Sequence, residues 1–171
     1  MSAATWPQAL AAVLRHEGGW SDHPRDPGGA TMKGITLATF RADRGEERTK
    51  ADLRAISDAD VEQIYRRRYW NAVRGDELPA GVDLAVFDAA VNSGPGRATR
   101  WLQQAIGVWP DGMIGPRTMA AVAQQDAADL IDRICDLRLG YLKALPTFDV
   151  FGMGWTRRVA AVRREAKSFA T

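Results

Sequence analysis

The segment VDLAVFDAAV, residues 82–91, is almost continuously apolar. A helix that is apolar on nearly every side belongs at the centre of a fold, where all of its faces are covered. Before and after this segment, apolar residues recur at i, i+3 and i+4, which is the spacing of one helical face. The sequence therefore predicts a mainly α fold built around residues 82–91.

Helix-start and helix-stop signals outline the elements before this segment. Side chains that can cap a helix N-terminus stand at Thr5, Thr36, Thr49 and Ser57. The first of these helices is expected to stop at Gly18-Gly19, which leaves Glu17 in its last turn. Residues 20–34 are rich in Gly, Pro and Asp, and they predict a structured loop or a short hairpin.

The chain after this segment is also expected to be helical. The run NSGPG at 92–96 is a sharp break, a long helix is expected over about residues 127–145, and a last helix from about Trp155. This last helix contains one acidic residue, Glu165, and the basic residues Arg157, Arg158, Arg163, Arg164 and Lys167. Such a helix is usually a solvated face, and its positive charge could also attract an anionic polymer.

Composition excludes several classes of protein. The 171 residues are 46% hydrophobic, which is enough for a real core, and the net charge of +2 lacks the dense basic stripe of a dedicated nucleic-acid binder. The single cysteine, Cys135, excludes an internal disulfide. With only His16 and His23 beside it, a structural zinc site is not expected either. We therefore expect no metal, no organic cofactor and no nucleic-acid partner.

The sequence carries no sign of a membrane-spanning or targeting segment. No run approaches the roughly 18 consecutive apolar residues of a spanning helix. Residues 1–7 do not show the basic region followed by an apolar region that makes a signal peptide. The protein is expected to stay in the cytoplasm unless another component releases it.

The most informative segment is HEGGWSDHPRDPGGATMKGIT, residues 16–36. A carboxylic acid beside an aromatic residue and a glycine-rich loop suits the cleavage of glycosidic bonds, in which an acid with a raised pKa protonates the leaving oxygen. Glu17 is the candidate acid, and Asp22 and Asp26 are candidates for the second carboxylate. The alternative interpretation is a helix C-cap followed by ordinary turns, with Glu17 as a surface charge.

Several segments, in order along the chain, carry a resemblance to a known family. They are EGGW at 17–20, PRDPGG at 24–29, IYRRRYW at 64–70, DAAVNSG at 88–94, and LQQAIGV with DGMIGPRT within 102–118. Together they resemble glycoside hydrolase family 108, the N-acetylmuramidases found as phage and prophage endolysins and as bacterial secretion-activator proteins. The last segment is similar to the peptidoglycan-binding region predicted to follow the catalytic part.

This resemblance implies a fold and a division of the chain. The fold would be lysozyme-like and mainly α, with a small loop or hairpin after the catalytic Glu and a helical C-terminal lobe. Residues 1–94 would form the catalytic part and residues 95–171 the lobe with the peptidoglycan-binding region, in one compact unit. The partner would be the glycan strands of peptidoglycan, and we expect a monomer.

The resemblance also assigns roles to single residues. Glu17 matches the catalytic acid of the E-G-G-[YW] motif, and Trp20 stands where Tyr is frequent. Phage-type lysozymes use a Glu, Asp and Thr triad at nearly the spacing found here. On that basis Asp26 is the first candidate for the second carboxylate, and Asp22 is the next. Thr31 is expected to contact water or sugar, although it lies one position earlier than the triad spacing requires.

Substrate contacts are predicted outside the glycine-rich segment as well. Tyr65, Tyr69 and Trp70 could line a sugar groove by stacking on pyranose rings. Tyr65 and Tyr69 stand four residues apart, so core packing of one or both is at least as good an explanation for them. Asn92 begins a turn that looks like the N-A-G-P-G turn of lytic transglycosylases and goose-type lysozymes, where the Asn contacts substrate. The alternative is a simple helix break with Asn92 as the cap.

The predicted function is hydrolysis of the β-1,4 bond between N-acetylmuramic acid and N-acetylglucosamine, which lyses bacterial cell walls. The alternatives are a lytic transglycosylase that uses the same Glu, and a non-catalytic peptidoglycan-binding or export-accessory protein. An endolysin of this kind would wait in the host cytoplasm until a holin opens the membrane, and would then act in the periplasm or cell wall. The basic last helix could help to hold that anionic wall.

Overall fold

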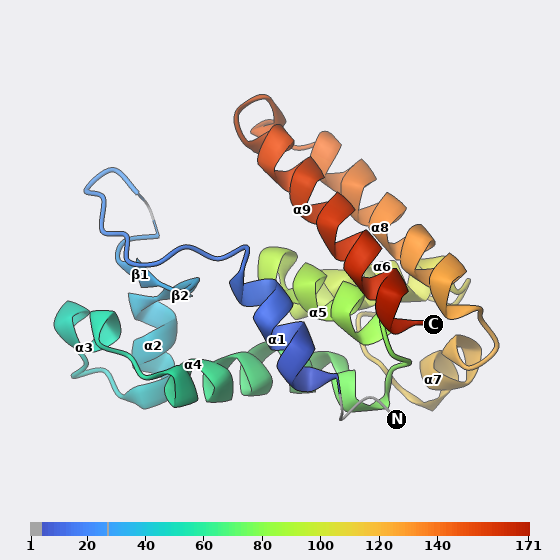
Figure 1. The fold of residues 1–171 in the computed structure, drawn as a ribbon, viewed down its shortest axis with the longest axis horizontal. Helices are drawn as coiled ribbons and strands as arrows, with labels where there is room; N and C mark the ends of the chain where they lie inside the picture. Colours follow the sequence, from blue (N-terminus) through green and yellow to red (C-terminus); the bar gives the residue numbers. More distant parts are fainter. Residues whose placement is uncertain (1–4, 27) are drawn as a thin grey trace. The chain divides into compact units, whose positions relative to one another are not determined.

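The computed structural model of the protein describes residues 5–26 and 28–171 (Figure 1). Its elements are α1 (Trp6–Leu14), β1 (Thr31–Met32), β2 (Ile35–Thr36), α2 (Leu37–Arg44), α3 (Lys50–Arg54), α4 (Asp58–Tyr65), the π-helix η2 (Arg66–Trp70), the 3₁₀ turns η3 (Asn71–Val73) and η4 (Gly75–Glu77), α5 (Val82–Ser93), α6 (Pro95–Ala105), α7 (Pro116–Val122), α8 (Ala127–Lys143) and α9 (Phe148–Phe169). Helices dominate these residues, which confirms the mainly α class. None of these helices combines the length and the apolarity that a membrane span needs.

By packing, the chain divides into two compact units. The smaller unit is Leu10–Arg68, and the larger unit is Tyr69–Thr171 together with the start of α1 as far as Ala9. The predicted division into a catalytic part, residues 1–94, and a C-terminal lobe, residues 95–171, stays a prediction.

The larger unit is built on α5. Residues 82–90 of this helix are all buried, and α5 packs against α6, α8 and α9. Gly94, with φ 89°, ends α5, and Pro95 takes the first position of α6, where a missing N–H costs nothing. Both the central helix and the break behind it are therefore confirmed.

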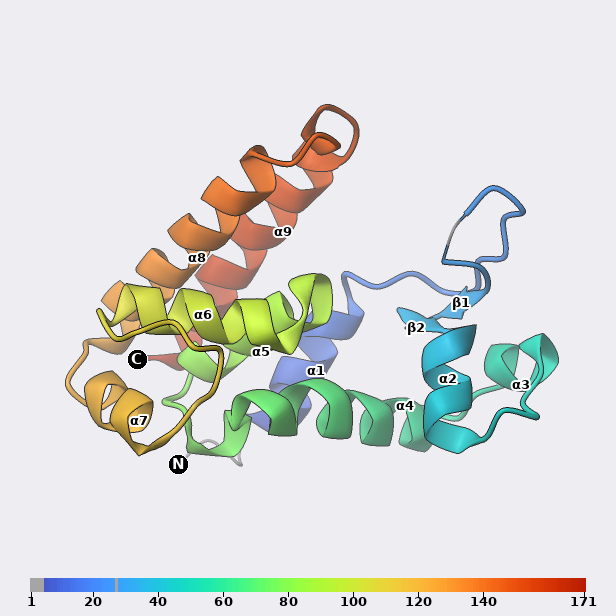
Figure 2. The ribbon, with the colours of Figure 1, turned by 180° about the vertical axis from the view of Figure 1, so that it is seen from behind.

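The last helix is longer than the sequence predicts. α8 and α9 lie side by side in both ribbon views (Figures 1 and 2). α9 begins at Phe148 and not near Trp155. The Trp155 ring contacts the rings of Phe148 and Phe151, with centroids 6.3 and 5.7 Å apart. These aromatic residues share one helical face, and their packing outweighs the low helix propensity of Gly152 and Gly154.

Most of the basic residues of α9 form ion pairs inside the larger unit. The pairs are Arg158 with Asp88, Arg163 with Asp132 and Asp136, and Lys167 with Asp132. Of the five cations predicted to attract an anionic wall, Arg157 and Arg164 are the two without an ion pair in the part of the chain that the structure describes. The positive charge of this helix is thus largely neutralised.

An aromatic cluster forms part of the core of the larger unit. The rings of Trp6, Trp70 and Phe87 pack against one another, with centroids 5.1 to 5.5 Å apart. Trp70 has no exposed surface, and its indole N–H donates a hydrogen bond of 2.9 Å to Asp76 Oδ1. Such a Trp satisfies its polar atom internally and stabilises the core through its buried ring.

The smaller unit contains the predicted hairpin. β1 and β2 pair antiparallel, with Thr31 opposite Thr36 and Met32 opposite Ile35, and the two residues between the strands are Lys33 and Gly34. Both have positive φ, 50° and 78°. That combination is the signature of a type I′ turn, whose twist matches that of the paired strands.

Helix caps in the smaller unit lie where the sequence predicts them. The hydroxyls of Thr36, Thr49 and Ser57 each accept a hydrogen bond from the backbone N–H three residues on, at the start of α2, α3 and α4 respectively. Thr49 and Asp52 form a complete capping box. These local signals suffice to position three helix starts.

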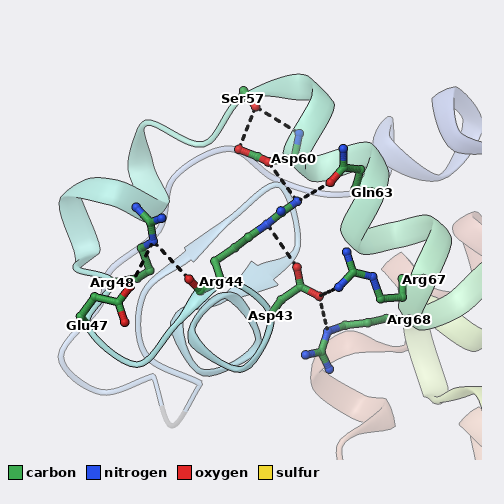
Figure 3. Close-up of polar contacts among 9 residues, drawn as sticks. All are labelled: Asp43, Arg44, Glu47, Arg48, Ser57, Asp60, Gln63, Arg67 and Arg68. Carbon is green, nitrogen blue, oxygen red and sulfur yellow. Dashed lines mark hydrogen bonds and ion pairs between the residues drawn. The ribbon is translucent and has the colours of Figure 1, made fainter.

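A buried carboxylate joins α2 to η2. The Asp43 side chain is 2% exposed and faces the guanidinium groups of Arg44, Arg67 and Arg68 at 3.2, 3.4 and 3.8 Å (Figure 3). Arg44 also pairs with Asp60 at 2.9 Å. A buried charge of this kind needs its partners, since an unpaired one is strongly destabilising. The cluster is structural.

Candidate active site

Glu17 follows α1 in a tightened turn. The helix ends at Leu14, so the prediction that Glu17 lies in its last turn is wrong by three residues. The N–H of His16 bonds to the Val13 carbonyl (3.0 Å), and that of Glu17 to the Leu14 carbonyl (3.2 Å). These i to i−3 bonds wind the backbone into a narrower turn than an α-helix. The Glu17 side chain is half-buried.

The Glu17 carboxylate lies over the backbone of Gly34. A β-carbon at Gly34 would come within 2.7 Å of Glu17 Oε2 and within 2.5 Å of the Tyr65 hydroxyl. The carboxylate and the phenol therefore converge on the same point of the hairpin turn. Glycine is required at position 34 for two reasons: the backbone has a positive φ, and there is no room for a side chain.

Both ends of α4 hold the hairpin turn. The hydroxyl of Tyr65, a residue that is 1% exposed, donates a 2.7 Å hydrogen bond to the Lys33 carbonyl. At the other end of α4, Asp58 accepts from Lys33 Nζ at 2.5 Å, and this contact lowers the pKa of the exposed Asp58 carboxyl. The buried bond carries more weight, because exposed ion pairs contribute little. Tyr65 is thus a positioning residue for the turn beside Glu17.

Asp22 is an exposed residue with a cationic partner. Its two carboxylate oxygens accept hydrogen bonds of 3.2 and 3.0 Å from Lys50 Nζ, at the start of α3. The preceding Ser21 pairs with Thr31 through two backbone bonds, of 2.9 and 2.7 Å, which extends the hairpin by one bridge. Thr31 is half-buried, and this pairing fixes its backbone.

Asp26 is exposed and stabilises its own loop. Its Oδ1 accepts a 2.9 Å hydrogen bond from the Gly28 N–H, and its carbonyl accepts one of 3.0 Å from the Gly29 N–H. A side chain bonded to the backbone two residues on is a common way for Asp to stabilise a turn. Pro27 of the predicted D-P-G-G motif lies outside the described residues.

Trp20 is half-buried, with the Arg54 guanidinium 5.5 Å from the centroid of its ring. Such a cation over an aromatic face is attracted by the electrons of the ring.

The smaller unit contains all three carboxylates of the predicted site, together with Trp20 and Thr31. The structure gives Glu17 a defined neighbour in Tyr65, while Asp22 is paired with Lys50 and Asp26 with its own turn.

In the larger unit, a buried ion pair orients Asn92. Arg138, which is 1% exposed, donates to Asp88 Oδ2 at 2.6 Å and to Asn92 Oδ1 at 3.1 Å. Burial raises the pKa of Asp88, but the charges and hydrogen bonds of Arg138 and Arg158 outweigh it, so that the pKa lies below its ordinary value. The Asn92 oxygen is occupied by Arg138, which leaves its amide N–H₂ group to meet a ligand.

The motif DAAVNSG contains a functional residue, Asp88, to which the sequence alone assigns no role. A signal was present, because Asp88 and Asn92 stand four residues apart and therefore share one helical face. A carboxylate inside a largely apolar helix needs a partner that compensates its burial, such as a group of opposite charge. That partner, Arg138, lies 50 residues away in the sequence.

Two pockets adjoin Asn92 and the start of α6. The first, of about 200 Å³, is lined by Asn92, Ser93, Arg97, Tyr141, Leu142, Leu145 and Trp155. The second, of about 310 Å³, is lined by Arg97, Arg100, Trp101, Gln104 and Tyr141. Asn92 therefore lines a pocket, and its role as a substrate contact stays a prediction.

The two predicted aromatic contacts of the larger unit differ in accessibility. Tyr69 is half-buried. Trp70 is fully buried between Trp6 and Phe87, so the prediction that it stacks on a sugar is corrected, since no face of its ring is accessible. The i to i+1 neighbours of a helix point in different directions, which is why only one of the two is accessible.

Comparison with known proteins identifies the family. The family model of glycosyl hydrolase 108 matches residues 10–94, and that of a predicted peptidoglycan domain matches residues 97–160. The solved structure of SagA from Brucella abortus is 50% identical, with a TM-score of 0.90, over 98% of this chain and 96% of that chain. The chain belongs to glycosyl hydrolase family 108. No significant match is found among curated proteins.

Membership of family 108 confirms several predictions. The protein is a glycoside hydrolase with a mainly α, lysozyme-like fold, and its two matched regions together make it a peptidoglycan hydrolase. Of the segments that resemble this family, EGGW at 17–20 lies in the smaller unit and DAAVNSG at 88–94 lies in the larger unit.

Proposed function

We propose that this peptidoglycan hydrolase cleaves the β-1,4 bond between N-acetylmuramic acid and N-acetylglucosamine, with Glu17 as the general acid. The observation that carries the proposal is the convergence of the Glu17 carboxylate and the Tyr65 hydroxyl over Gly34. A carboxyl group that is half-buried, beside a fixed hydroxyl and above a glycine, is held in place while one side stays open to substrate.

The acid delivers its proton to the glycosidic oxygen as the bond to the sugar breaks. This leaves a positively charged, oxocarbenium-like carbon that a carboxylate or a positioned water must stabilise and capture. Asp26 remains the first candidate for that second group and Asp22 the next, with Thr31 as a water or sugar contact. Lys50 partly neutralises Asp22, which supports this order.

Substrate contacts are proposed for the accessible aromatic and amide groups. Trp20 and Tyr69 each offer part of an aromatic ring to a pyranose face, and Asn92 offers its amide in the pocket beside Ser93. Trp70 is not among these contacts. It supports the core of the larger unit instead.

The second candidate function is a lytic transglycosylase reaction. It is favoured by the turn at residues 92–97, where Asn92, oriented by Arg138, lines a pocket. Such an enzyme would use Glu17 first as acid and then as base, and it would need no second carboxylate. Its product ends in a 1,6-anhydro sugar, which forms without uptake of water.

Mass spectrometry of digested peptidoglycan distinguishes these functions. The wild type is expected to release muropeptides with reducing ends, each one water heavier than the anhydro product. Glu17→Gln should release almost none, Asp26→Asn should be impaired, and Asp22→Asn should be impaired less. Anhydro ends alone would establish the transglycosylase. A wild type that sediments with cell walls, releases nothing and is unaffected by Glu17→Gln would leave only a binding protein.

We also propose that the enzyme lyses bacterial cell walls as a monomeric endolysin, held in the host cytoplasm until a holin opens the membrane. Expression with and without a holin tests this route. Lysis is expected only when both are present, and it should require an intact Glu17. Lysis by the enzyme alone would contradict holin-dependent release.

A further inference from the structure

The two pockets at the start of α6 share one wall, made by Arg97 and Tyr141. The Arg97 guanidinium lies over the Tyr141 ring, 4.0 Å from its centroid, and the Tyr141 ring contacts that of Trp101 at 5.6 Å. Stacking on an aromatic platform holds the guanidinium in one orientation although Arg97 is exposed. Less conformational entropy is then lost when it binds a ligand.

A second guanidinium, that of Arg100, lines the larger of the two pockets. It is flanked by two glycines: a β-carbon at Gly112 would lie 3.2 Å from Arg100 Cζ, and one at Gly96 would lie 3.5 Å from its Nη1. The backbone at both positions therefore approaches the charged group closely. Arg97 and Arg100 are three residues apart in α6, so they lie on neighbouring parts of one helical face.

These two cations differ from those of α9. In α9 the larger share of the positive charge is neutralised by carboxylates of α5 and α8. Neither Arg97 nor Arg100 forms an ion pair anywhere in residues 5–26 and 28–171. The charge of Arg100 is partly offset at longer range by Asp111, whose pKa is lowered chiefly by its hydrogen bonds with Gln103 and Met113. The positive charge of Arg97 is therefore offset less than that of Arg100.

We propose that Arg97 and Arg100 bind carboxylate groups of the peptide stem carried by N-acetylmuramic acid, while the pocket of Asn92 and Trp155 holds the sugar. The proposal rests on the proposed function, and it names the part of the substrate that the region matched by the peptidoglycan-domain model recognises. A planar guanidinium pairs with a carboxylate through two parallel hydrogen bonds, which makes arginine suited to anionic peptides. The neutral glycan backbone offers it no such partner.

Binding measured without turnover tests the proposal. In the full chain with Glu17→Gln, we compare affinities for a muropeptide with its stem and for the disaccharide of N-acetylglucosamine, which carries neither a stem nor a lactyl carboxylate. The double substitution Arg97→Ala with Arg100→Ala should weaken binding of the stem-bearing ligand about tenfold or more, which is ~1.4 kcal/mol or more. Binding of the N-acetylglucosamine disaccharide, which has no carboxylate, should not change.

A matched control removes two positive charges elsewhere. Arg157→Ala with Arg164→Ala, on α9, should leave both affinities unchanged, because these exposed cations line neither pocket. Arg97→Lys keeps the positive charge but loses the planar guanidinium. Its affinity for the stem-bearing muropeptide should lie between those of the wild type and of Arg97→Ala.

Two outcomes would overturn the proposal. If the double substitution weakens binding of both ligands equally, the arginines contact the glycan and not the stem. If it weakens binding only to cell walls that carry phosphate polymers, the arginines bind phosphate. These outcomes are separable from failure of the proposed function, because they concern binding alone. If the wild type cleaves the predicted bond and binding shows no dependence on the stem, only this inference fails.

Discussion

The surroundings of Glu17 and those of Asn92 are held in place by different interactions. Beside Glu17, a two-residue turn is fixed by hydrogen bonds from Tyr65 and from the ladder of a very short hairpin. Beside Asn92, a buried carboxylate and two arginines join α5 to α8 and α9. Disturbing the first should impair activity more than stability, whereas disturbing the second should impair stability more.

The largest effect on stability is expected from Arg138→Met. The substitution keeps much of the aliphatic volume but leaves the buried Asp88 with Arg158 as its remaining partner. Breaking a buried pair typically costs about 3–5 kcal/mol, and we expect the lower end of that range. Urea denaturation measures it. Adding Asp88→Asn to Arg138→Met should recover part of the loss, and a double variant less stable than the single one would contradict the account.

Gly34→Ala should reduce activity strongly and stability moderately. The new methyl group would collide with the Glu17 carboxylate, and positive φ costs a non-glycine residue roughly 1–2 kcal/mol. We expect hydrolysis to fall by about 100-fold, since small misplacements of a catalytic group have effects of that size. Gly154→Ala, a helical site with open space, is the control and should match the wild type. Full activity of Gly34→Ala would mean that Glu17 does not act from this position.

Tyr65→Phe should have a smaller effect of the same kind. It removes one buried hydrogen bond to the Lys33 carbonyl, worth about 1 kcal/mol, and leaves the ring in the core. Hydrolysis should fall by about tenfold with a changed pH–rate profile, because the group beside Glu17 is lost. A fall in stability with an unaltered profile would make Tyr65 a core residue only.

The smallest expected effect is a pH dependence of stability. Because its two arginines hold the pKa of Asp88 below the ordinary value, the ionised form stabilises the fold above roughly pH 4, near the unfolded pKa. That contribution is lost as pH falls through the lower pKa of the folded state. Denaturation between about pH 2 and 7 should show a steeper loss in the wild type than in Asp88→Asn. Parallel curves would contradict the assignment.

Local signals made much of the fold predictable. The caps at Thr36, Thr49 and Ser57 act through a neighbour three residues away, and the apolar helix at 82–91 needs no partner to be recognised. The partner of Asp88 was not predictable, because Arg138 lies 50 residues away. Trp70 was misassigned for a related reason, since an aromatic side chain has the same pattern in a core as in a sugar groove.

The candidate site was predictable in part. The family resemblance supplied Glu17 and its neighbours, but no spacing in the sequence indicates that the Tyr65 hydroxyl reaches the carbonyl of Lys33, 32 residues away. The sequence predicts too late a start for α9, because the glycines at 152 and 154 weaken a helical pattern that aromatic packing sustains. In each case tertiary contacts decided what local propensity could not.

The most direct test of the account is the rate of muropeptide release by Glu17→Gln beside the wild type, with thermal unfolding measured on both. The account predicts a fall of at least about 10²-fold, the lower end of what general acid catalysis contributes, with an unchanged unfolding temperature. A variant that stays folded and releases muropeptides at the wild-type rate would show that Glu17 is not the acid.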